Sequence, residues 1–269
     1  MSEIVTERSG SILSIQFNRP EKKNALTMSM YDTVAELLNA AAKDDGIRVV
    51  LVHGAGDSFS AGNDLGDFLK NPPKGYDSPQ GHFIDALNSF DKPLIAAVHG
   101  AAIGSGTTML TFCDFVYASE HTTFQMPFVN LALVPELGTS YSLPAQIGYI
   151  AAAELILLGL PFDARRAAEL GLVTRIVLEA DLLPTAFETA QRLAQQPAGA
   201  VQASKRLMKR FSREQTAAAA RLEVEEYVSR LQSADAKEAL NAFFDKRKAD
   251  FSQTKTAPAV RALQPSAIE

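Results

Sequence analysis

Three short, continuous apolar runs constrain the fold of this chain more than any other feature of its sequence. They are Val49–Val52, Leu94–Val98 and Phe115–Ala118. An apolar run of this length without polar alternation predicts a strand that is buried on both faces. Ile12–Phe17 instead mixes apolar and polar residues, which indicates a further strand. Because helical stretches separate these runs, we expect an α/β fold with a parallel sheet component.

Length and composition limit the class of protein. The chain has 269 residues, enough for one large domain or a domain with an appendage. Hydrophobic residues make up 46% and charged residues 21%, which excludes disorder over most of the chain. The net charge of −5 argues against a nucleic-acid groove, which needs a basic surface. Cys113 is the only cysteine and the four histidines lack metal-ligand spacing, so we expect no disulfide and no metal site.

The sequence contains no segment that predicts contact with a membrane. No run reaches the roughly 18 apolar residues that a spanning helix needs. The first ten residues lack the basic segment and apolar run of a signal peptide. We therefore expect a cytoplasmic protein without a membrane partner.

The spacing of apolar residues changes along the chain. From about Pro197 onward it becomes helical, which predicts a cap or an oligomerisation arm after an α/β body. We therefore divide the chain into a core of residues 1–200 and a helical region of residues 201–269. Between Asp67 and Gly81, prolines and glycines without a period predict a mobile loop.

Two segments rich in small residues follow predicted strands. Phe59–Leu65 is either a ligand-binding segment or a plain strand-to-helix turn with Asp64 near the helix start. Val98–Gly106 lacks the third glycine of a dinucleotide fingerprint, because Met109 stands there. Ser105 is flanked directly by glycines, which does not match the nucleophile motif of serine hydrolases. What remains is a tight turn that can present the N–H of Ser105 to a developing oxyanion.

Two charged features could carry chemistry. Glu136 is the only charge between Glu120 and Glu154. Apolar surroundings raise the pKa of a carboxyl group, as a general base near neutral pH requires, but a glutamate at a helix start is an equal alternative. Phe243–Lys248 contains a basic cluster that is either a solvated helix end or a phosphate contact.

Taken together, these segments resemble the crotonase superfamily, the enoyl-CoA hydratase/isomerase family, over nearly the whole chain. The resemblance implies a crotonase (ClpP-like) spiral of ββα turns, a helical C-terminal trimerisation region, and homotrimers often paired into hexamers. It rests on these segments: Asn18–Leu26, Phe59–Leu65, Ile95–Gly106, Cys113-Asp114, Phe162–Val173, Ser204-Lys205 and Phe243–Ala249.

The resemblance also implies a binding site for an acyl-CoA. The backbone N–H groups of Asn63 and Ser105 would hold the thioester oxygen, and donors from the backbone allow the side chains at these two positions to differ. The carbonyl of Ala61 would meet the adenine amine, and Lys246 would reach the CoA of a neighbouring subunit. The residues that the resemblance places on CoA are Lys23, Ala25, Ala61, Asp64 and Lys246.

The departures from the family pattern favour one reaction. Thr108 and Phe128 stand where hydratases of the family carry two glutamates. Glu136 stands where the branch similar to 3,2-trans-enoyl-CoA isomerase places its single glutamate. We therefore predict an isomerase that moves a double bond from C3 to C2 of an enoyl-CoA. Glu136 would take a proton from C2 and return one at C4, and no cofactor beyond the CoA of the substrate is expected.

Three alternatives remain at this point. The first is hydration or another enolate reaction, with a base such as Asp67. The second is a non-catalytic homologue that binds CoA or RNA, although Glu136 has no role there. The third is a serine hydrolase built on Ser105, for which no motif places a histidine.

Overall fold

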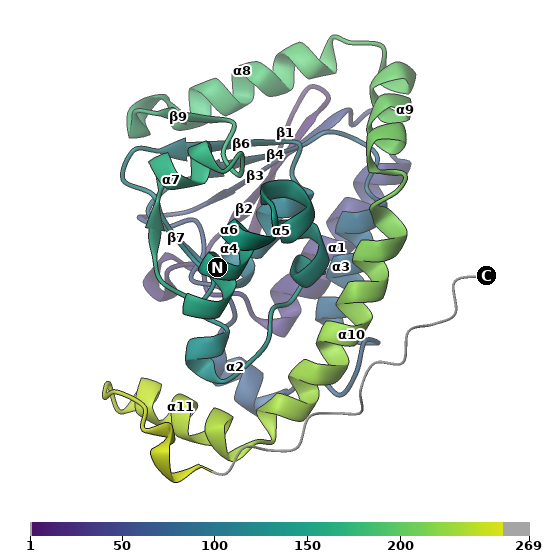
Figure 1. Cartoon of the computed structure of the whole chain (residues 1–269). Helices are drawn as coiled ribbons and strands as arrows, with labels where there is room; N and C mark the ends of the chain where they lie inside the picture. Colours follow the sequence, from purple (N-terminus) through teal and green to yellow (C-terminus); the bar gives the residue numbers. More distant parts are fainter. Residues whose placement is uncertain (1, 255–269) are drawn as a thin grey trace, which may run out of the picture.

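A mixed six-stranded sheet forms the centre of the computed structural model, which describes residues 2–254 (Figure 1). Its order is β1-β2-β3-β4-β6-β9, and every neighbouring pair is parallel except the antiparallel pair β1-β2. The strands are β1 (Ile4–Ser9), β2 (Ile12–Phe17), β3 (Val49–Gly54), β4 (Leu94–Val98), β6 (Phe115–Ser119) and β9 (Arg175–Val177). The four expected strands are confirmed. The sequence did not predict β1, because all but one of its side chains are exposed or nearly so at the sheet edge.

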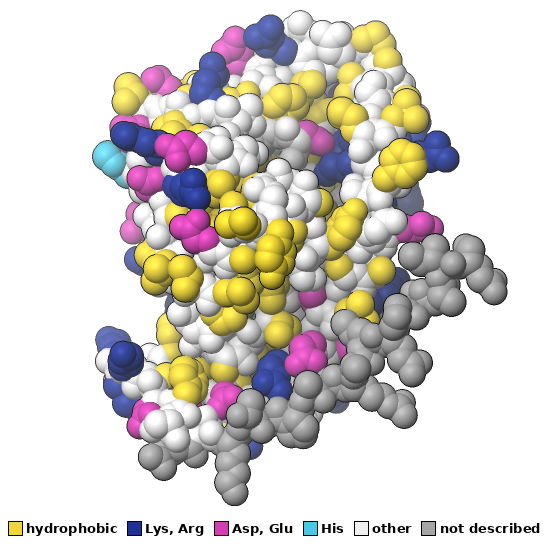
Figure 2. All heavy atoms as spheres, in the orientation of Figure 1, with side chains coloured by type: hydrophobic (Ala, Val, Ile, Leu, Met, Phe, Trp, Pro, Cys, Tyr) yellow, Lys and Arg dark blue, Asp and Glu magenta, His cyan; other side chains and the backbone are white. Residues whose placement is uncertain are grey.

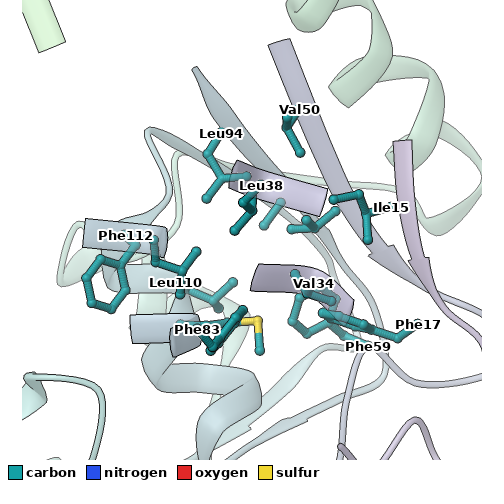
Figure 3. Close-up of a cluster of buried hydrophobic side chains, with 14 of the residues drawn as sticks. Ile15, Phe17, Val34, Leu38, Val50, Phe59, Phe83, Leu94, Leu110 and Phe112 are labelled. Carbon is teal, nitrogen blue, oxygen red and sulfur yellow. The ribbon is translucent and has the colours of Figure 1, made fainter. Parts of the chain in front are cut away.

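Helices cover both faces of this sheet, which explains the continuous apolar runs. On one face α1 (Met28–Lys43) and α3 (Pro79–Ser89) enclose the larger core, drawn with Val50 and Leu94 in Figure 3. On the other face α8 (Leu182–Ala194) packs against Val49, Leu51 and Ile95. Alternate residues of one strand therefore enter different cores, so neither set can be polar.

A second sheet completes a spiral. It contains β5 (Ala101–Ile103), β7 (Thr123–Gln125) and β8 (Phe162–Asp163). Ser60, which follows β3, forms an isolated bridge with Ala102 of β5. Each repeat of the spiral contributes a strand to the large sheet and then a segment in or beside the small sheet. A helix follows and leads to the next repeat. The helices that follow are α2 (Leu65–Lys70) with α3, α4 (Ser105–Thr108), and α5 (Thr139–Ile147) with α6 (Tyr149–Leu158). The expected α/β spiral of ββα turns is confirmed.

Helices dominate the C-terminal part of the chain, as expected. In Figure 1, α9 (Ala198–Lys209) and α10 (Arg213–Leu231) run down one side of the molecule, and α11 (Ala234–Phe244) lies at its base. No helix within residues 2–254 is long and apolar enough to cross a membrane. The remaining elements are α7 (Ala164–Glu169) and five short 3-10 helices at Pro20–Lys22, Met109–Phe112, Val129–Leu131, Glu179–Asp181 and Phe251–Gln253.

The loop expected between Asp67 and Gly81 is confirmed for residues 71–78, but both ends of that stretch are helical. Asp64 caps α2 by accepting hydrogen bonds from the N–H groups of Gly66 and Asp67, so the helix continues to Lys70. Ser78 caps α3 in the same way. Only residues 71–78 lie between the two helices, because polar caps at both ends compensate for the breaker residues.

A buried ion pair ties α9 to the sheet. Lys205 lies with its Nζ atom 2.6 Å from Oδ2 of Asp114 and donates to the carbonyl of Lys92 at 2.8 Å. The same Asp114 oxygen accepts from the N–H of Leu94, the first residue of β4. The Cys113-Asp114 and Ser204-Lys205 segments therefore meet in space.

We expect Lys205→Met to lower the free energy of unfolding by about 2–4 kcal/mol, because it leaves Asp114 without its counter-charge. Urea unfolding followed by circular dichroism measures this loss. Lys237→Met, at an exposed position of α11, is the control and should change the value by less than about 0.5 kcal/mol. An equal effect of the two variants would contradict the structural role of the pair.

Candidate active site

A cavity of about 340 Å³ lies where the segment after β3, the turn after β5 and the helix α11 meet. Its wall is largely apolar and contains few ionisable groups. It is lined by Lys22, Ala25, Ala61, Gly62, Asn63, Asp64, Leu65, Gly66, Ile103, Gly104, Pro127, Phe128, Leu131, Leu133, Glu136, Tyr227, Phe243 and Phe244. A concave apolar pocket with a few convergent polar groups is the usual form of a small-molecule site.

Backbone pairing brings the two small-residue segments together. The N–H of Ser60 donates to the carbonyl of Ala101 at 3.0 Å, and the N–H of Ile103 donates back to Ser60 at 2.9 Å. Gly62, with φ of +81°, lies so close that a Cβ atom there would stand 2.5 Å from the carbonyl oxygen of Ile103. Only glycine fits this position, so the small residues serve close backbone approach.

The pairing leaves two backbone N–H groups free. Leu26 donates to the carbonyl of Gly62 and accepts from the N–H of Asp64, so the N–H of Asn63, between them, does not join the bridge. Gly104, with φ of +55°, turns the chain so that α4 begins at Ser105. Within residues 2–254 neither the N–H of Asn63 nor that of Ser105 has a hydrogen-bond acceptor. Both segments that carry them contribute to the cavity wall.

Glu136 is a buried carboxylate in the wall of the cavity, with 6% of its surface exposed. Its Oε2 atom accepts a hydrogen bond from Nδ2 of Asn63 at 3.1 Å, and its Oε1 atom has no partner in the described part of the chain. Burial raises its pKa from the ordinary value of 4.5 to about 7; the charge of Glu223 adds to this rise and the Asn63 hydrogen bond opposes it. The group can therefore accept a proton near neutral pH.

The side chain of Asn63 is held by two further residues. Its Oδ1 atom accepts from the hydroxyl of Tyr31 at 2.6 Å and from Nε2 of Gln80 at 3.2 Å. These bonds orient the amide so that its NH₂ group points at Glu136. The side chain of Asn63 therefore contacts the cavity carboxylate in addition to the free backbone N–H of this residue.

The other carboxylates near the cavity are occupied. Asp64 lines it, but its oxygens accept from Arg19 and from the N–H groups of Gly66 and Asp67. Asp67, the alternative base, accepts from the N–H of Met28 and from Asn71 and does not belong to the lining residues. Each of its two oxygens thus accepts a hydrogen bond, one of them from the first residue of α1.

The structure gives neutral side chains to the two positions where hydratases carry glutamates. Thr108 is fully buried at the end of α4, and its hydroxyl oxygen has no partner within residues 2–254. Phe128 is buried and lines the cavity with its ring. Neither side chain can act as a base.

Of the five residues expected to contact CoA, three line the cavity and two do not. Ala25, Ala61 and Asp64 line the cavity, whereas Lys23 does not. Lys23 is exposed in a left-handed backbone conformation, and its carbonyl accepts from the N–H of Ala61 at 2.8 Å. Its neighbour Lys22 lines the cavity instead. Lys246 is exposed and lies outside the lining. Contact with CoA stays a prediction for all five residues.

Four residues around Glu136 were not predicted from the sequence: Tyr31, Gln80, Glu223 and Tyr227. Burial raises the pKa of both tyrosines well above the ordinary value, and the nearby charge of Glu136 adds to this. Tyr31 and Tyr227 occupy core-facing positions of amphipathic helices, where an aromatic residue gives no separate signal. Within residues 2–254 no group of three or more potential ligands is arranged to hold a metal ion.

This fold and cavity define an α/β protein with a small-molecule site that contains one buried carboxyl group able to take up a proton near neutral pH. Residues 7–255 match the model of the enoyl-CoA hydratase/isomerase family. The chain belongs to this family and has the crotonase fold.

Similar proteins carry the names of more than one reaction. The chain is 37% identical to human enoyl-CoA delta isomerase 2 over 78% of its own length, but it spans only 55% of that protein. It is 32% identical to a probable enoyl-CoA hydratase of Rhizobium meliloti, over 92% of this chain and 97% of the other. The solved structure of Pseudomonas aeruginosa OdaA is 43% identical with a TM-score of 0.88, covering 90% of this chain and 99% of that chain. The comparisons thus support a CoA-thioester enzyme without deciding between isomerase and hydratase.

We expect Asn63→Ala to raise the pKa of Glu136 further above 7, because it removes the hydrogen bond that favours the carboxylate. Carbon-13 NMR titration of glutamate carboxyls follows this directly, with the Glu136 signal assigned from its loss in Glu136→Gln. Asn71→Ala, in which the lost amide contacts Asp67 only, is the control. A Glu136 pKa that is unchanged or lower in Asn63→Ala would contradict the assigned contact.

The raised pKa of Glu136 also predicts how stability depends on pH. The folded state holds the proton of Glu136 more tightly than the unfolded chain does, so the contribution of this group to stability is most favourable below pH 4.5 and is lost as pH rises through about 7. Glu136→Gln stays neutral and avoids this loss. We expect its stability advantage over the wild type to grow by about 2–3 kcal/mol between pH 5 and pH 8. Urea unfolding at both pH values measures it, and an advantage independent of pH would refute the raised pKa.

Proposed function

We propose that this protein is an acyl-CoA isomerase that moves a double bond from C3 to C2 of an enoyl-CoA. The observation that carries the proposal is the state of Glu136: a buried carboxylate with one unpartnered oxygen in the cavity wall and a pKa near neutrality. Such a group is suited to take a proton from carbon and to return it.

The first step would be removal of a C2 proton by Oε1 of Glu136. Charge would then develop on the thioester oxygen, where the free N–H groups of Asn63 and Ser105 are proposed to donate. Fixed donors of this kind stabilise an oxyanion by about 3–4 kcal/mol each, because they need no reorganisation during the reaction. The product of this step is a dienolate with its negative charge shared between the oxygen, C2 and C4.

The second step would return a proton from Glu136 to C4, which leaves the double bond between C2 and C3. The substrate and the product are isomers, because one proton leaves C2 and one is added at C4. The two steps therefore need no oxidant, reductant or water. Within residues 2–254 the other carboxylate in the cavity wall, Asp64, is engaged by Arg19 and by two backbone N–H groups. Hydration would need an acid–base pair on a water molecule, and Thr108 and Phe128 cannot supply one. The single free carboxylate supports isomerisation over hydration.

We further propose that CoA lies at the mouth of the cavity against Ala25, Ala61 and Asp64, with Lys23 and Lys246 near its phosphates. Phe243 and Phe244 of α11 line the cavity, in accord with a C-terminal region that caps CoA. The division into residues 1–200 and 201–269 remains a proposal, and residues 255–269 lie outside the described part.

A homotrimer or hexamer is also proposed. Hydrophobic side chains gather over α5 and α6 in the middle of the face shown in Figure 2. Exposed apolar residues on or next to α6 include Tyr149, Ile150, Leu157, Leu158 and Leu160. Apolar patches of this kind mark protein interfaces. Sedimentation velocity measures the oligomeric state.

The test of the reaction is an assay of the purified protein on 3-enoyl-CoA and 2-enoyl-CoA side by side. We expect double-bond migration to be faster than water addition by at least about tenfold, which corresponds to about 1.4 kcal/mol in barrier. In Glu136→Gln we expect kcat for migration to fall by roughly 10²–10⁴, the usual contribution of general acid–base catalysis.

Asp67→Asn is the matched control for the base. Asp67 lies outside the cavity lining and its two oxygens accept from Met28 and Asn71, so this variant should keep kcat within about threefold. Faster hydration than isomerisation in the wild type would refute the proposed reaction. Full turnover by folded Glu136→Gln, with loss of turnover in Asp67→Asn, would transfer the role of base to Asp67.

A further inference from the structure

The loop that carries Glu136 is held by a second buried carboxylate, that of Glu223. This residue belongs to helix α10 in the C-terminal region. Oε2 of Glu223 accepts from the N–H of Gly138, and Oε1 accepts from the N–H of Ser140, both at 2.6 Å. Glu223 is 6% exposed. Both oxygens of one carboxylate therefore bind the start of α5, two and four residues after Glu136.

The backbone of this loop is constrained and needs such a contact. Leu137 and Gly138 have consecutive positive φ values of +61° and +68°, and Leu137 is a residue that rarely adopts this region. A Cβ atom on Gly138 would lie 2.6 Å from Cγ2 of Thr216. Thr216 and Glu223 are seven residues apart on α10, so one face of this helix contacts the loop at two points.

Glu223 is an unexpected residue at its position. The buried stripe of α10 consists of Thr216, Ala220, Glu223 and Tyr227. Glu223 is the only charged residue in this stripe. A buried carboxylate has a high desolvation cost unless it is hydrogen-bonded, so a purely structural stripe would favour an apolar residue here. Its carboxylate accepts from both N–H donors at once, one with each oxygen.

Glu223 is also close enough to Glu136 for their charges to interact. A small cavity of about 20 Å³ has both carboxylates in its wall, together with Gln80 and Tyr227. The charge of Glu223 contributes to the raised pKa of Glu136. The ionisable groups that face Glu136 are Tyr31 from α1 and Tyr227 and Glu223 from α10.

Glu223 itself is faced by Glu136 and by Tyr76, whose ring lies 4.3 Å from the guanidinium carbon of Arg221 and whose hydroxyl donates to Asp85. Burial raises the pKa of Tyr76, as it does for Tyr31 and Tyr227. The tyrosines therefore stay neutral near pH 7. The two carboxyl groups are therefore the ionisable neighbours that matter here, and burial raises the pKa of each of them.

We propose that Glu223 is a positioning residue for Glu136: it fixes the loop that carries the base and places a second negative charge beside it. This inference rests on the proposed function, in which Glu136 moves the proton. It assigns the C-terminal helix α10 a part in the reaction, because the proton acceptor is aligned by a side chain 87 residues further along the chain.

Two variants separate the two effects of Glu223. Glu223→Gln keeps the size of the side chain but removes the charge and one of the two acceptors. We expect kcat to fall by roughly 10–100-fold, as for a small misplacement of a catalytic group, with KM changed less than about twofold. We also expect the pKa of Glu136 to fall, so the acidic limb of the kcat profile moves to lower pH.

Glu223→Asp keeps the charge but shortens the side chain by one methylene. We expect kcat to fall while the pKa of Glu136 stays raised. Glu225→Gln is the control, because Glu225 is exposed on the same helix and should leave kcat, the pH profile and the NMR titration unchanged. Thermal unfolding of all three variants identifies any loss of folded protein.

The result that overturns the proposal is Glu223→Gln with wild-type kcat and a wild-type pKa of Glu136. A loss of kcat that merely parallels the loss of folded protein, with the pKa of Glu136 unchanged, overturns it equally, since Glu223 would then be structural only. Carbon-13 titration of Glu136 needs no turnover. If the wild type fails to isomerise 3-enoyl-CoA, the proposed function fails, while the titration still decides whether Glu223 acts on Glu136.

Discussion

The rest of the site depends on the close contact between two backbone segments that have almost no side-chain bulk. Ser60 pairs with the strand Ala101–Ile103, and Gly62 lies against the carbonyl of Ile103, where any Cβ atom would collide. This contact joins the large sheet to the small one and leaves the N–H groups of Asn63 and Ser105 without acceptors in the described part of the chain. A fold normally pairs its buried N–H groups, so two free donors beside a cavity represent stability that is given up for binding.

Glu136 is a second polar group of the site that is buried without full hydrogen bonding. A carboxylate in an apolar wall destabilises the folded state at neutral pH, and its Oε1 atom is buried without a hydrogen-bond partner in the described part of the chain. The surrounding polar contacts do not neutralise this cost; they hold the group in one orientation. Asn63, itself held by Tyr31 and Gln80, fixes one oxygen, and the loop behind Glu136 is fixed from α10 by Glu223. The hydrogen bonds therefore fix the orientation of Glu136, whereas burial sets its pKa.

The proposed reaction rests on which carboxylates of the site are free to accept a proton. Asp64 and Asp67 belong to the same segment as Asn63, but their oxygens accept hydrogen bonds at the starts of helices. Asp64 is the N-cap of α2, and Asp67 accepts from the first N–H of α1. Thr108 and Phe128 remove the two places where a pair of glutamates would hold water. The family is shared by proteins named as isomerases and as hydratases, so membership alone leaves the chemistry open.

The sequence by itself determined four strands of the large sheet, the small-residue turns and the isolation of Glu136, because each depends on local pattern: apolar runs, glycine, and the absence of other charges nearby. The ββα spiral was available only through resemblance, since periodicity cannot say how successive strands are distributed between two sheets. Tertiary structure alone decided which polar groups meet. Asn63 and Glu136 lie 73 residues apart, and Glu136 and Glu223 lie 87 apart. No local pattern encodes such contacts, because they arise when helices from distant parts of the chain pack around one cavity.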